Sequence, residues 1–347
     1  MIDIKIKLPV AVFEIFSVIE EYGAEAYVVG GCVRDSIMGR EPHDWDICTP
    51  VLAPELRGLF EEKGYKVIPT GLQHGTITVV IDGGRYEITQ FRRDGDYSDG
   101  RHPDNVEFTS NLIEDLERRD FTINAMAYNP RTGLIDPFDG MRDIRNSRIV
   151  CVGSAKERFK EDSLRILRAI RFAAQLKFSI SSDTSHEIHM QYKNLENISI
   201  ERINSEFIKI VKTSKLSESL AQYGNIFWLF IPELKDMFGF PQNNPYHCYD
   251  VWNHTLTAID NCSTEDLITR MAVLFHDVGK PYCCQVDESG YRHFRGHGKV
   301  STAMTDSIMK RLRFDNDTRE KVVELIYYHD ATFEVGTKYV KRWLNKI

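Results

Sequence analysis

The segment GGCVRDSIMGREPHDWD, residues 30–46, constrains the chain more than any other, because it joins two glycines, an arginine and two aspartates. Glycine lets a backbone approach a ligand closely, and the guanidinium of Arg34 suits phosphate. Asp44 and Asp46 are two residues apart, so on a strand rising about 3.3 Å per residue they share one face. Two such carboxylates can hold hard divalent cations. The segment therefore predicts a phosphate-binding turn beside a metal site.

The glycine turn and a later strand extend this candidate site. Backbone N–H groups of Gly30 and Gly31 at a helix start favour a triphosphate. Magnesium accepts carboxylate oxygens and bridges substrate phosphates. Glu87, in the strand-like segment RYEITQF, is a candidate third carboxylate, and an ordinary exposed strand residue is the equal alternative. A pair of aspartates alone is common on surfaces, so the prediction depends on the turn that precedes it.

Composition limits the class of protein. The chain has 347 residues, enough for two or three domains, and no apolar run long enough to span a bilayer. Its seven cysteines form no CxxC pair, which favours reduced thiols, no cysteine-based zinc site and a cytoplasmic location. The net charge of −7 argues against a nonspecific nucleic-acid coat. Residues 142–177 nevertheless carry ten basic and four acidic residues, which indicates either a phosphate-binding groove or a solvated helix face.

The periodicity changes near residue 154. Before it, short strand and helix signals alternate, and residues 74–91 predict a hairpin that turns at residues 82–84. After it, residues 155–178 predict one long helix with Ser154 as its N-cap. Two shorter segments, EAYVVGG and HDWDIC, read as strands. The segment CVRDSIM, which lies between them, reads as a helix. FGFPQNNPYH is the best candidate linker, and the chain beyond it looks helical.

Further motifs follow the first one in a fixed order. They are LERRDFTINAMAYN at 116–129, DPFDG at 136–140, EDSLRILRAIRFAAQL at 161–176 and ERINSEF at 201–207. Together with GGCVRD and DWD they resemble the class II tRNA nucleotidyltransferase and bacterial poly(A) polymerase family, over roughly residues 20–240. The resemblance implies an α+β fold: a polymerase-β-like nucleotidyltransferase head with a small mixed sheet, then an all-α neck and a helical body. We expect these domains at 1–150, 151–238 and 239–347.

The resemblance also implies roles for individual residues. Asp44 and Asp46, with Glu87 beside them, would be the catalytic carboxylates that hold Mg²⁺. An RNA 3′-hydroxyl would attack the α-phosphate of CTP or ATP, and pyrophosphate would leave. The nucleotide-binding residues would be Gly30, Gly31, Arg34, Arg119, Asp120, Asn124, Asp162, Arg165, Arg168 and Arg171.

Asp162 and Arg165 would read the base. They are three apart on the expected helix, so they would share a face. A carboxylate accepts from the exocyclic amino group of C or A, and a guanidinium donates to the ring acceptor beside it. U and G present the opposite polarity and would leave buried groups unpaired. A surface ion pair on a helix is the alternative.

The family includes CCA-adding, A-adding and poly(A)-adding enzymes. The segment FRRDGDYSDGRHPDN, with Arg101 inside it, resembles a flexible loop that CC-adding members lack. We therefore expect addition of C and A to the 3′ end of tRNA without a nucleic-acid template, and no membrane or obligate protein partner. A-addition and poly(A) synthesis stay open.

The C-terminal part carries a second pattern, in the segments VWNHTLTAID, LFHDVGKP, HFRGHGKV and YYHDATF. It resembles the HD phosphohydrolase superfamily. The resemblance implies a divalent transition metal (Mn, Ni, Fe or Co) bound by His254, His276, Asp277 and Asp330, which would activate water against a phosphate ester. Two different functions also stay open: a phosphohydrolase whose N-terminal domain only binds nucleotides, and an RNA-binding body with an idle metal site.

Overall fold

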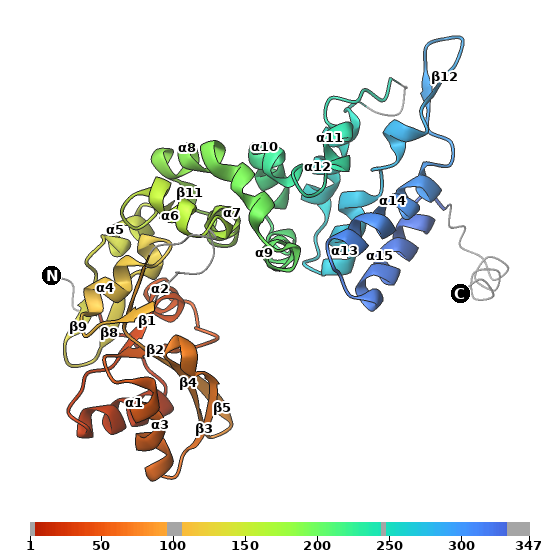
Figure 1. Ribbon diagram of the computed structural model, residues 1–347. Coiled ribbons are helices and arrows are strands. Elements are labelled where there is room, and N and C mark those ends of the chain that lie inside the picture. Colours follow the sequence, from red (N-terminus) through yellow and green to blue (C-terminus); the bar gives the residue numbers. More distant parts are fainter. Residues whose placement is uncertain (1–3, 96–105, 244–247, 332–347) are drawn as a thin grey trace. The chain divides into compact units, whose positions relative to one another are not determined.

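The computed structural model describes residues 4–95, 106–243 and 248–331 (Figure 1). The chain divides into two units, 1–198 and 199–347, and each is described by itself. The division into three domains at residues 150 and 238 stays a prediction. The segment around Arg101 lies outside the described residues, as does part of the expected linker.

The N-terminal unit is built on a seven-stranded mixed sheet with the order β3-β4-β5-β2-β1-β8-β9. Strands β2 and β5 run parallel, and the other neighbouring pairs in this sheet are antiparallel. The expected α+β head with a small mixed sheet is thereby confirmed. The elements that make up or contact the sheet are α1 (Val10–Glu21), β1 (Tyr27–Val29), α2 (Gly31–Ile37), β2 (Asp46–Thr49), α3 (Ala53–Glu62), β3 (Lys66–Gly71), β4 (Thr76–Ile81), β5 (Gly84–Gln90), α4 (Leu112–Glu117), β8 (Ala127–Asn129), β9 (Gly133–Ile135) and α5 (Gly140–Arg145).

Side-chain alternation gives this sheet two buried faces. Val28, Ile47 and Ile88 point into a core that α1 and α3 cover, while Tyr27 and Cys48 point into a second core on the opposite face. Burying each large apolar side chain stabilises the fold by about 1.5–3 kcal/mol. Figure 1 shows α1 and α3 next to each other, in agreement with their contact. The central strands are therefore fixed on both sides.

The local predictions for the sheet are confirmed. Strands β4 and β5 form the expected hairpin, and Asp82 and Gly83 occupy its two-residue turn with φ of 50° and 81°. Positive φ at both positions is what a type I′ turn requires, and the sequence Asp-Gly supplies it. The strand expected over HDWDIC is shorter, because β2 begins at Asp46 and Asp44 precedes it.

The single long helix expected over residues 155–178 is wrong. The segment forms α6 (Ala155–Glu161) and α7 (Leu164–Leu176), with a break at Asp162. The Asp162 Oδ1 atom accepts a hydrogen bond from the Leu164 N–H at 3.1 Å, and such a local bond competes with helix continuation. Ser154 is at the N-cap of α6, but its side chain makes no capping bond.

The rest of the N-terminal unit is small. Its remaining elements are β6 (Arg92–Asp94), β7 (Val106–Phe108), β10 (Arg148–Ile149), β11 (Ser179–Ile180), α8 (Ser182–Gln191) and three short 3₁₀ turns at Leu72–His74, Thr122–Asn124 and Tyr192–Asn197. Strands β10 and β11 pair in parallel on either side of α6 and α7 in the chain. This pairing ties the start and the end of the α6–α7 segment together.

The C-terminal unit is helical, as expected, apart from one short hairpin that the sequence did not indicate. Its elements are α9 (Ile200–Val211), α10 (Leu216–Phe227), α11 (Glu233–Met237), α12 (Val251–Asn261), α13 (Leu267–Phe275), a 3₁₀ turn (Lys280–Tyr282), β12 (Gln285–Val286), β13 (Arg292–His293), α14 (His297–Arg311) and α15 (Asn316–Tyr328). None of the helices in the described parts of the chain has the length and apolar character that crossing a bilayer requires.

Candidate nucleotide site and metal centre

Three carboxylates lie on one face of the N-terminal sheet. Asp46 and Glu87 are direct partners in the parallel β2–β5 pair, so their side chains leave the sheet on the same side. Trp45 packs into the core under α1 and α3 and Asp46 points to the opposite side, where the charge of Asp44, just before β2, acts on it. All three carboxylate residues are exposed. The sheet therefore presents an open, acidic surface whose hard oxygen donors fit Mg²⁺.

The shift in the pKa of Asp46 shows which charged side chains lie close to it. The carboxylate is open to solvent on one side, but the surrounding protein desolvates it and raises its pKa. The positive charge of Arg119 opposes this rise, and the negative charge of Asp44 adds to it. Asp46 thus lies close to both an acidic and a basic neighbour. A cation bound between the two aspartates would remove the repulsion between them.

The glycine turn before α2 places Arg119. Gly30 is the N-cap of α2, with φ of 79° and ψ of −128°, a conformation that side chains rarely adopt. A Cβ atom at Gly30 would lie 2.8 Å from Nη1 of Arg119. The sequence predicts for this glycine a close backbone approach toward phosphate. The structure gives it a second role, since a Cβ atom here would push the guanidinium of Arg119 out of its position.

Replacing Gly30 with alanine is therefore expected to disturb both the backbone and Arg119. We expect the free energy of unfolding to fall by about 1–3 kcal/mol, because alanine is strained at this φ and ψ. Gly39→Ala is the matched control, since Gly39 also has positive φ (69°) but nothing within 4 Å of its Cβ position. Chemical denaturation and a CTP titration of both variants check this. Equal loss of CTP affinity in the two would contradict the role given to Arg119.

A chain of hydrogen bonds joins four of the expected nucleotide-binding residues. Arg34 donates from Nη1 to Oδ1 of Asn124 at 2.6 Å, and Asn124 donates from Nδ2 to Oδ1 of Asp120 at 3.0 Å. Both oxygens of Asp120 are used, because Arg168 donates from Nε to Oδ2 at 2.8 Å and also from Nη2. Arg34, Asp120 and Asn124 are buried. The network fixes α2, the Thr122–Asn124 turn and α7 relative to one another.

Asp120 is the charged centre of this network. Burial would raise the pKa of Asp120, but the charge of Arg168 and the hydrogen bonds from Asn124 and Arg168 lower it to about 2. An unfolded aspartate has a pKa of about 3.9. Because the folded pKa is the lower one, the stabilisation is present in full above about pH 4 and is lost as pH falls toward about 2.

Asp120→Asn tests this linkage. We expect the free energy of unfolding at pH 7 to fall by on the order of 2 kcal/mol, and the deficit to shrink between about pH 4 and pH 2. Urea unfolding of the full chain at pH 7, 5 and 3, followed by circular dichroism, measures it. Asp82→Asn, in the exposed hairpin turn, is the control. A deficit at pH 3 equal to that at pH 7 would contradict the assignment.

The two residues expected to read the base do not share a helix. Asp162 lies in the break between α6 and α7, and Arg165 lies in the first turn of α7. The buried Arg165 donates from Nη1 to Oε2 of Glu161 at 2.6 Å and from Nη2 to the carbonyl oxygen of Arg118 at 2.9 Å. Asp162 is half-buried. The predicted placement on one helical face is therefore wrong, while the base-reading role itself stays a prediction.

The basic segment 142–177 is neither a uniform solvated face nor a single open groove. Arg165 and Arg171 are buried, Arg168 is partly exposed, and Arg145, Lys156, Lys160 and Lys177 are exposed. The guanidinium carbon of Arg171 lies 4.0 Å from the ring centroid of Phe172. Part of the local positive charge thus belongs to the interior of the N-terminal unit.

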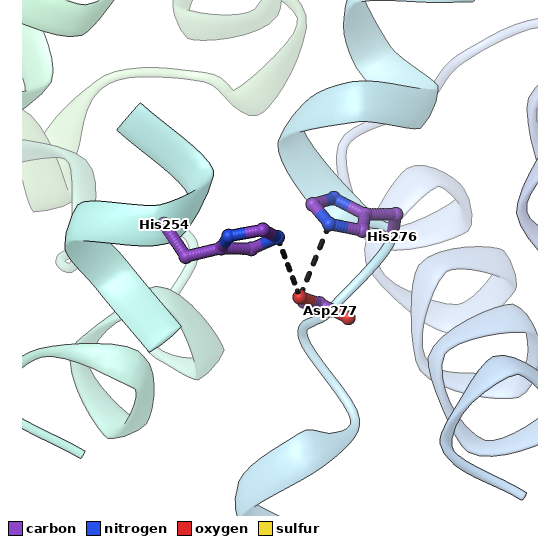
Figure 2. A group of neighbouring side chains, drawn as sticks. All are labelled: His254, His276 and Asp277. Atoms are coloured by element: carbon purple, nitrogen blue, oxygen red, sulfur yellow. Dashed lines mark ion pairs between the residues drawn. The ribbon is translucent and has the colours of Figure 1, made fainter. Parts of the chain in front are cut away.

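The C-terminal unit gathers imidazoles and carboxylates around Asp277. His254 comes from α12 and His276 directly follows α13; their Nε2 atoms lie 3.5 and 3.1 Å from Oδ2 of Asp277 (Figure 2). Nε2 of His297, the first residue of α14, lies 3.2 Å from Oδ1. Asp330 contacts His297 at 3.1 Å. The four expected ligands are therefore brought together, and two further histidines, His297 and His329, join them.

The ring orientation of three of these histidines suits metal binding. Nδ1 lies 2.6–2.9 Å from the carbonyl oxygen three residues earlier in His276, His297 and His329. A neutral ring whose Nδ1 donates to that oxygen presents its Nε2 lone pair to a metal. The Nε2 atoms of His297 and His329 face each other at 3.1 Å. Two lone pairs at this distance repel, so a cation or a proton is needed between them.

Asp277 itself is an unusual buried carboxylate. Among the described residues neither of its oxygens has a hydrogen bond of normal geometry, although the Lys280 Nζ atom lies 2.8 Å from Oδ2. Burial would raise the pKa of Asp277, but His276, His297 and Lys280 lower it strongly. Close polar partners without hydrogen-bond angles indicate a group shaped for a different ligand. Imidazoles with a carboxylate form a donor set that fits a divalent transition metal.

A glycine and a lysine that follow Asp277 complete the surroundings of this centre. A Cβ at Gly279 would lie 2.6 Å from the backbone nitrogen of Ser301 in α14. Its role is to admit α14 close to Asp277. Lys280 contacts Asp277 and donates to Oε1 of Gln242 at 2.9 Å.

Sequence reasoning missed several residues of both sites. His329 and His297 appear in those segments, but the resemblance implied ligands only at His254, His276, Asp277 and Asp330. His293, in the same segment as His297, pairs instead with Asp287 at 2.7 Å. Asp115 is fully buried and pairs with Arg118 and Arg119. Its i,i+3 and i,i+4 spacing to these arginines was the available signal.

The atoms that could bind metal lie closer together in the C-terminal site than in the N-terminal one. In the described residues, two groups of three such side chains have their ligand atoms within 4.8 Å of one another: His254, His276 and Asp277, and Asp277, His297 and His329. Asp44, Asp46 and Glu87 share a face but do not converge this closely. The C-terminal centre is therefore the better formed of the two.

Comparison with known families finds three matches along the chain. Residues 26–150 match the poly A polymerase head domain, residues 177–237 match the probable RNA and SrmB-binding site of polymerase A, and residues 246–340 match the HD domain. The chain therefore carries the head and RNA-binding domains of the poly(A) polymerase family together with an HD domain. The family resemblance of the sequence motifs is confirmed. Both domain types imply a requirement for divalent metal.

Similar proteins carry the name CCA-adding enzyme. One from Lactobacillus delbrueckii subsp. bulgaricus is 50% identical over 192 residues, which are 55% of this chain and 48% of that protein. One from Staphylococcus haemolyticus is 42% identical over 249 residues, or 71% and 61% of the two chains. The aligned chain thus covers less than two thirds of either relative.

Solved structures agree with the fold. The Bacillus stearothermophilus CCA-adding enzyme in complex with CTP has a TM-score of 0.56 and 26% identity, and the alignment covers 97% of this chain and 87% of that one. A tRNA nucleotidyltransferase complexed with a primer tRNA and an incoming ATP analog has a TM-score of 0.64 at 24% identity, over 96% and 90% of the chains. The second likeness concerns the fold alone.

Proposed function

We propose that this protein is a tRNA nucleotidyltransferase that adds C and A to the 3′ end of tRNA from CTP and ATP, without a nucleic-acid template. The observation that carries the proposal is the Asp46–Glu87 pairing, with Asp44 on the same face and the Gly30 turn and Arg119 beside it. The names of the similar proteins support the same activity. A cytoplasmic location stays a prediction.

The residues of the head would have different roles in nucleotide addition. Asp44 and Asp46, with Glu87 beside them, would hold Mg²⁺. When bound, the metal would lower the pKa of the attacking hydroxyl and neutralise charge on the leaving pyrophosphate. Arg119 and the N–H groups at the start of α2 would bind the triphosphate. Arg34 and Asn124 would orient the phosphates and sugar, and Asp120 would hold Arg168 in place.

Base selection would belong to Asp162 and Arg165. A buried polar pair that matches C and A leaves unpaired groups when U or G enters, and this loss gives strong discrimination. In the structure Arg165 bonds to Glu161 and to backbone oxygens, so it would have to exchange at least one of these bonds for the base. Glu161→Gln would then change the selection of nucleotide more than the rate of addition.

The decisive experiment is extension of trimmed tRNA. The protein is incubated with Mg²⁺ and tRNA lacking one, two or three terminal residues, and with CTP, ATP, UTP or GTP singly. We expect C to be added to the two shorter substrates and a single A to the third, with little use of UTP or GTP. Addition of A alone would identify an A-adding enzyme, long A tails a poly(A) polymerase, and no extension would overturn the proposal.

A second activity is favoured by the histidine cluster. We propose that the HD region binds divalent transition metal and hydrolyses a phosphate ester. His254, His276 and Oδ2 of Asp277 would hold one cation, and Oδ1 with His297, His329 and Asp330 a second. The metal would supply an activated water when bound. Asp277 would keep the two positions close together, and the Nδ1 contacts would hold the rings in place.

A further inference from the structure

The ring of Phe172 lies among the arginines of the nucleotide site. It is buried, and it points its π-system at guanidinium groups from two helices. The guanidinium carbons of Arg171, Arg34 and Arg168 lie 4.0, 5.1 and 5.5 Å from its centroid. An aromatic ring attracts cations within about 6 Å of its centroid. All three arginines meet that condition.

Two of these arginines are also tied to each other. Arg34 and Arg168 are the ends of the hydrogen-bonded chain through Asn124 and Asp120. Phe172 connects the two ends of this hydrogen-bonded series, since both guanidinium groups also lie near its ring. Arg34 comes from α2 and Arg168 from α7, so the ring joins the helix at the glycine turn to the helix that carries Arg165.

The balance of charges around Phe172 shows what its ring contributes. Asp35 pairs with Arg34 at 2.9 Å, and Asp120 pairs with Arg168. Three guanidinium groups around one ring still repel one another, and burial reduces screening by water. The negative face of an aromatic ring offsets part of this repulsion without accepting a hydrogen bond. The ring therefore stabilises the arginines without using any of their N–H donors.

We propose that Phe172 is a positioning residue, which sets the arginines of α2 and α7 for nucleotide binding through its π-system rather than by its volume. This inference rests on the proposed nucleotidyltransferase function. An edge-on contact with Phe121, at 5.7 Å and 80°, holds the ring in place. A ring that served packing alone would tolerate any apolar group of the same shape.

A change of ring electrostatics at constant shape separates the two roles. Phe172→pentafluorophenylalanine keeps the volume but reverses the charge distribution of the ring face. Phe172→Tyr keeps the aromatic face and Phe172→Leu removes it. Phe60→Leu is the packing control, because Phe60 is fully buried in the core under α1 and α3. Each protein is assayed for CTP dissociation by titration and for kcat and KM on trimmed tRNA.

We expect the fluorinated protein to show a KM and a dissociation constant for CTP raised about tenfold, with kcat changed less than about twofold. Phe172→Leu would share the loss and Phe172→Tyr would largely retain wild-type values. Phe60→Leu would lower the melting temperature without changing the KM. Wild-type CTP affinity in the fluorinated protein would overturn the positioning role. Absence of CTP binding and extension in the wild type would overturn the proposed function and this inference with it.

Discussion

Asp46→Asn is expected to abolish nucleotide addition while the protein stays folded. The substitution keeps the shape of the side chain and removes the charge that would hold a cation. Metal stabilisation of a phosphoryl-transfer transition state is worth several kcal/mol, so the rate should fall by about three orders of magnitude or more. Single-turnover extension of trimmed tRNA in excess Mg²⁺ measures this. Relief of repulsion with Asp44 should leave the free energy of unfolding unchanged or slightly raised.

Asp82→Asn is the matched control for this prediction. It makes the same chemical change on the same sheet, in the turn between β4 and β5, where asparagine tolerates positive φ as well as aspartate does. Its extension rate should equal that of the wild type. Glu87→Gln is informative beside it, because Glu87 is the strand partner of Asp46. A rate within tenfold of wild type for Asp46→Asn would show that the cations are held elsewhere.

Local features of the head could be predicted because each depends on a few neighbouring residues. Asp-Gly in a turn demands positive φ at two positions, which fixes the β4–β5 hairpin. The burial of Trp45 in the core turns Asp46 to the opposite face, and the two-residue spacing keeps Asp44 close to it. The pairing of Asp46 with Glu87 is different, because it depends on β5 lying beside β2 in parallel. No spacing along the chain specifies that strand order.

The features that could not be predicted depend on single bonds or on distant contacts. Helical periodicity continues through Asp162, but a single side-chain bond to Leu164 ends α6 there, and periodicity does not register such a bond. In the HD region the adjacent His276 and Asp277 were recognisable. His297 and His329 were not, since they reach Asp277 only through the packing of α14, for which Gly279 makes room, and of α15, which ends next to His329. Only the tertiary contacts of the folded chain identify these two histidines as candidate ligands.

His276→Ala is expected to remove phosphohydrolase activity and leave nucleotide addition intact. The side chain supplies one Nε2 donor to the position it shares with His254 and Asp277 (Figure 2). Loss of a first ligand should lower metal affinity and activity by about 100-fold or more. Manganese, cobalt and nickel bound per chain after dialysis are counted by mass spectrometry, and hydrolysis is followed with a 2′,3′-cyclic nucleotide and a phosphate monoester.

The metal count distinguishes one cation from two. If Asp277 joins two positions, Asp277→Asn should lose both metals, whereas His276→Ala and His297→Gln should each lose about one, because they belong to different ligand groups. His293→Ala is the control, since that exposed histidine pairs with Asp287 outside the cluster. A wild-type chain that binds no transition metal would show that a proton, rather than a cation, lies between the facing Nε2 atoms of His297 and His329. In that case Lys280 and the histidines would neutralise Asp277, and the region would have no hydrolytic role.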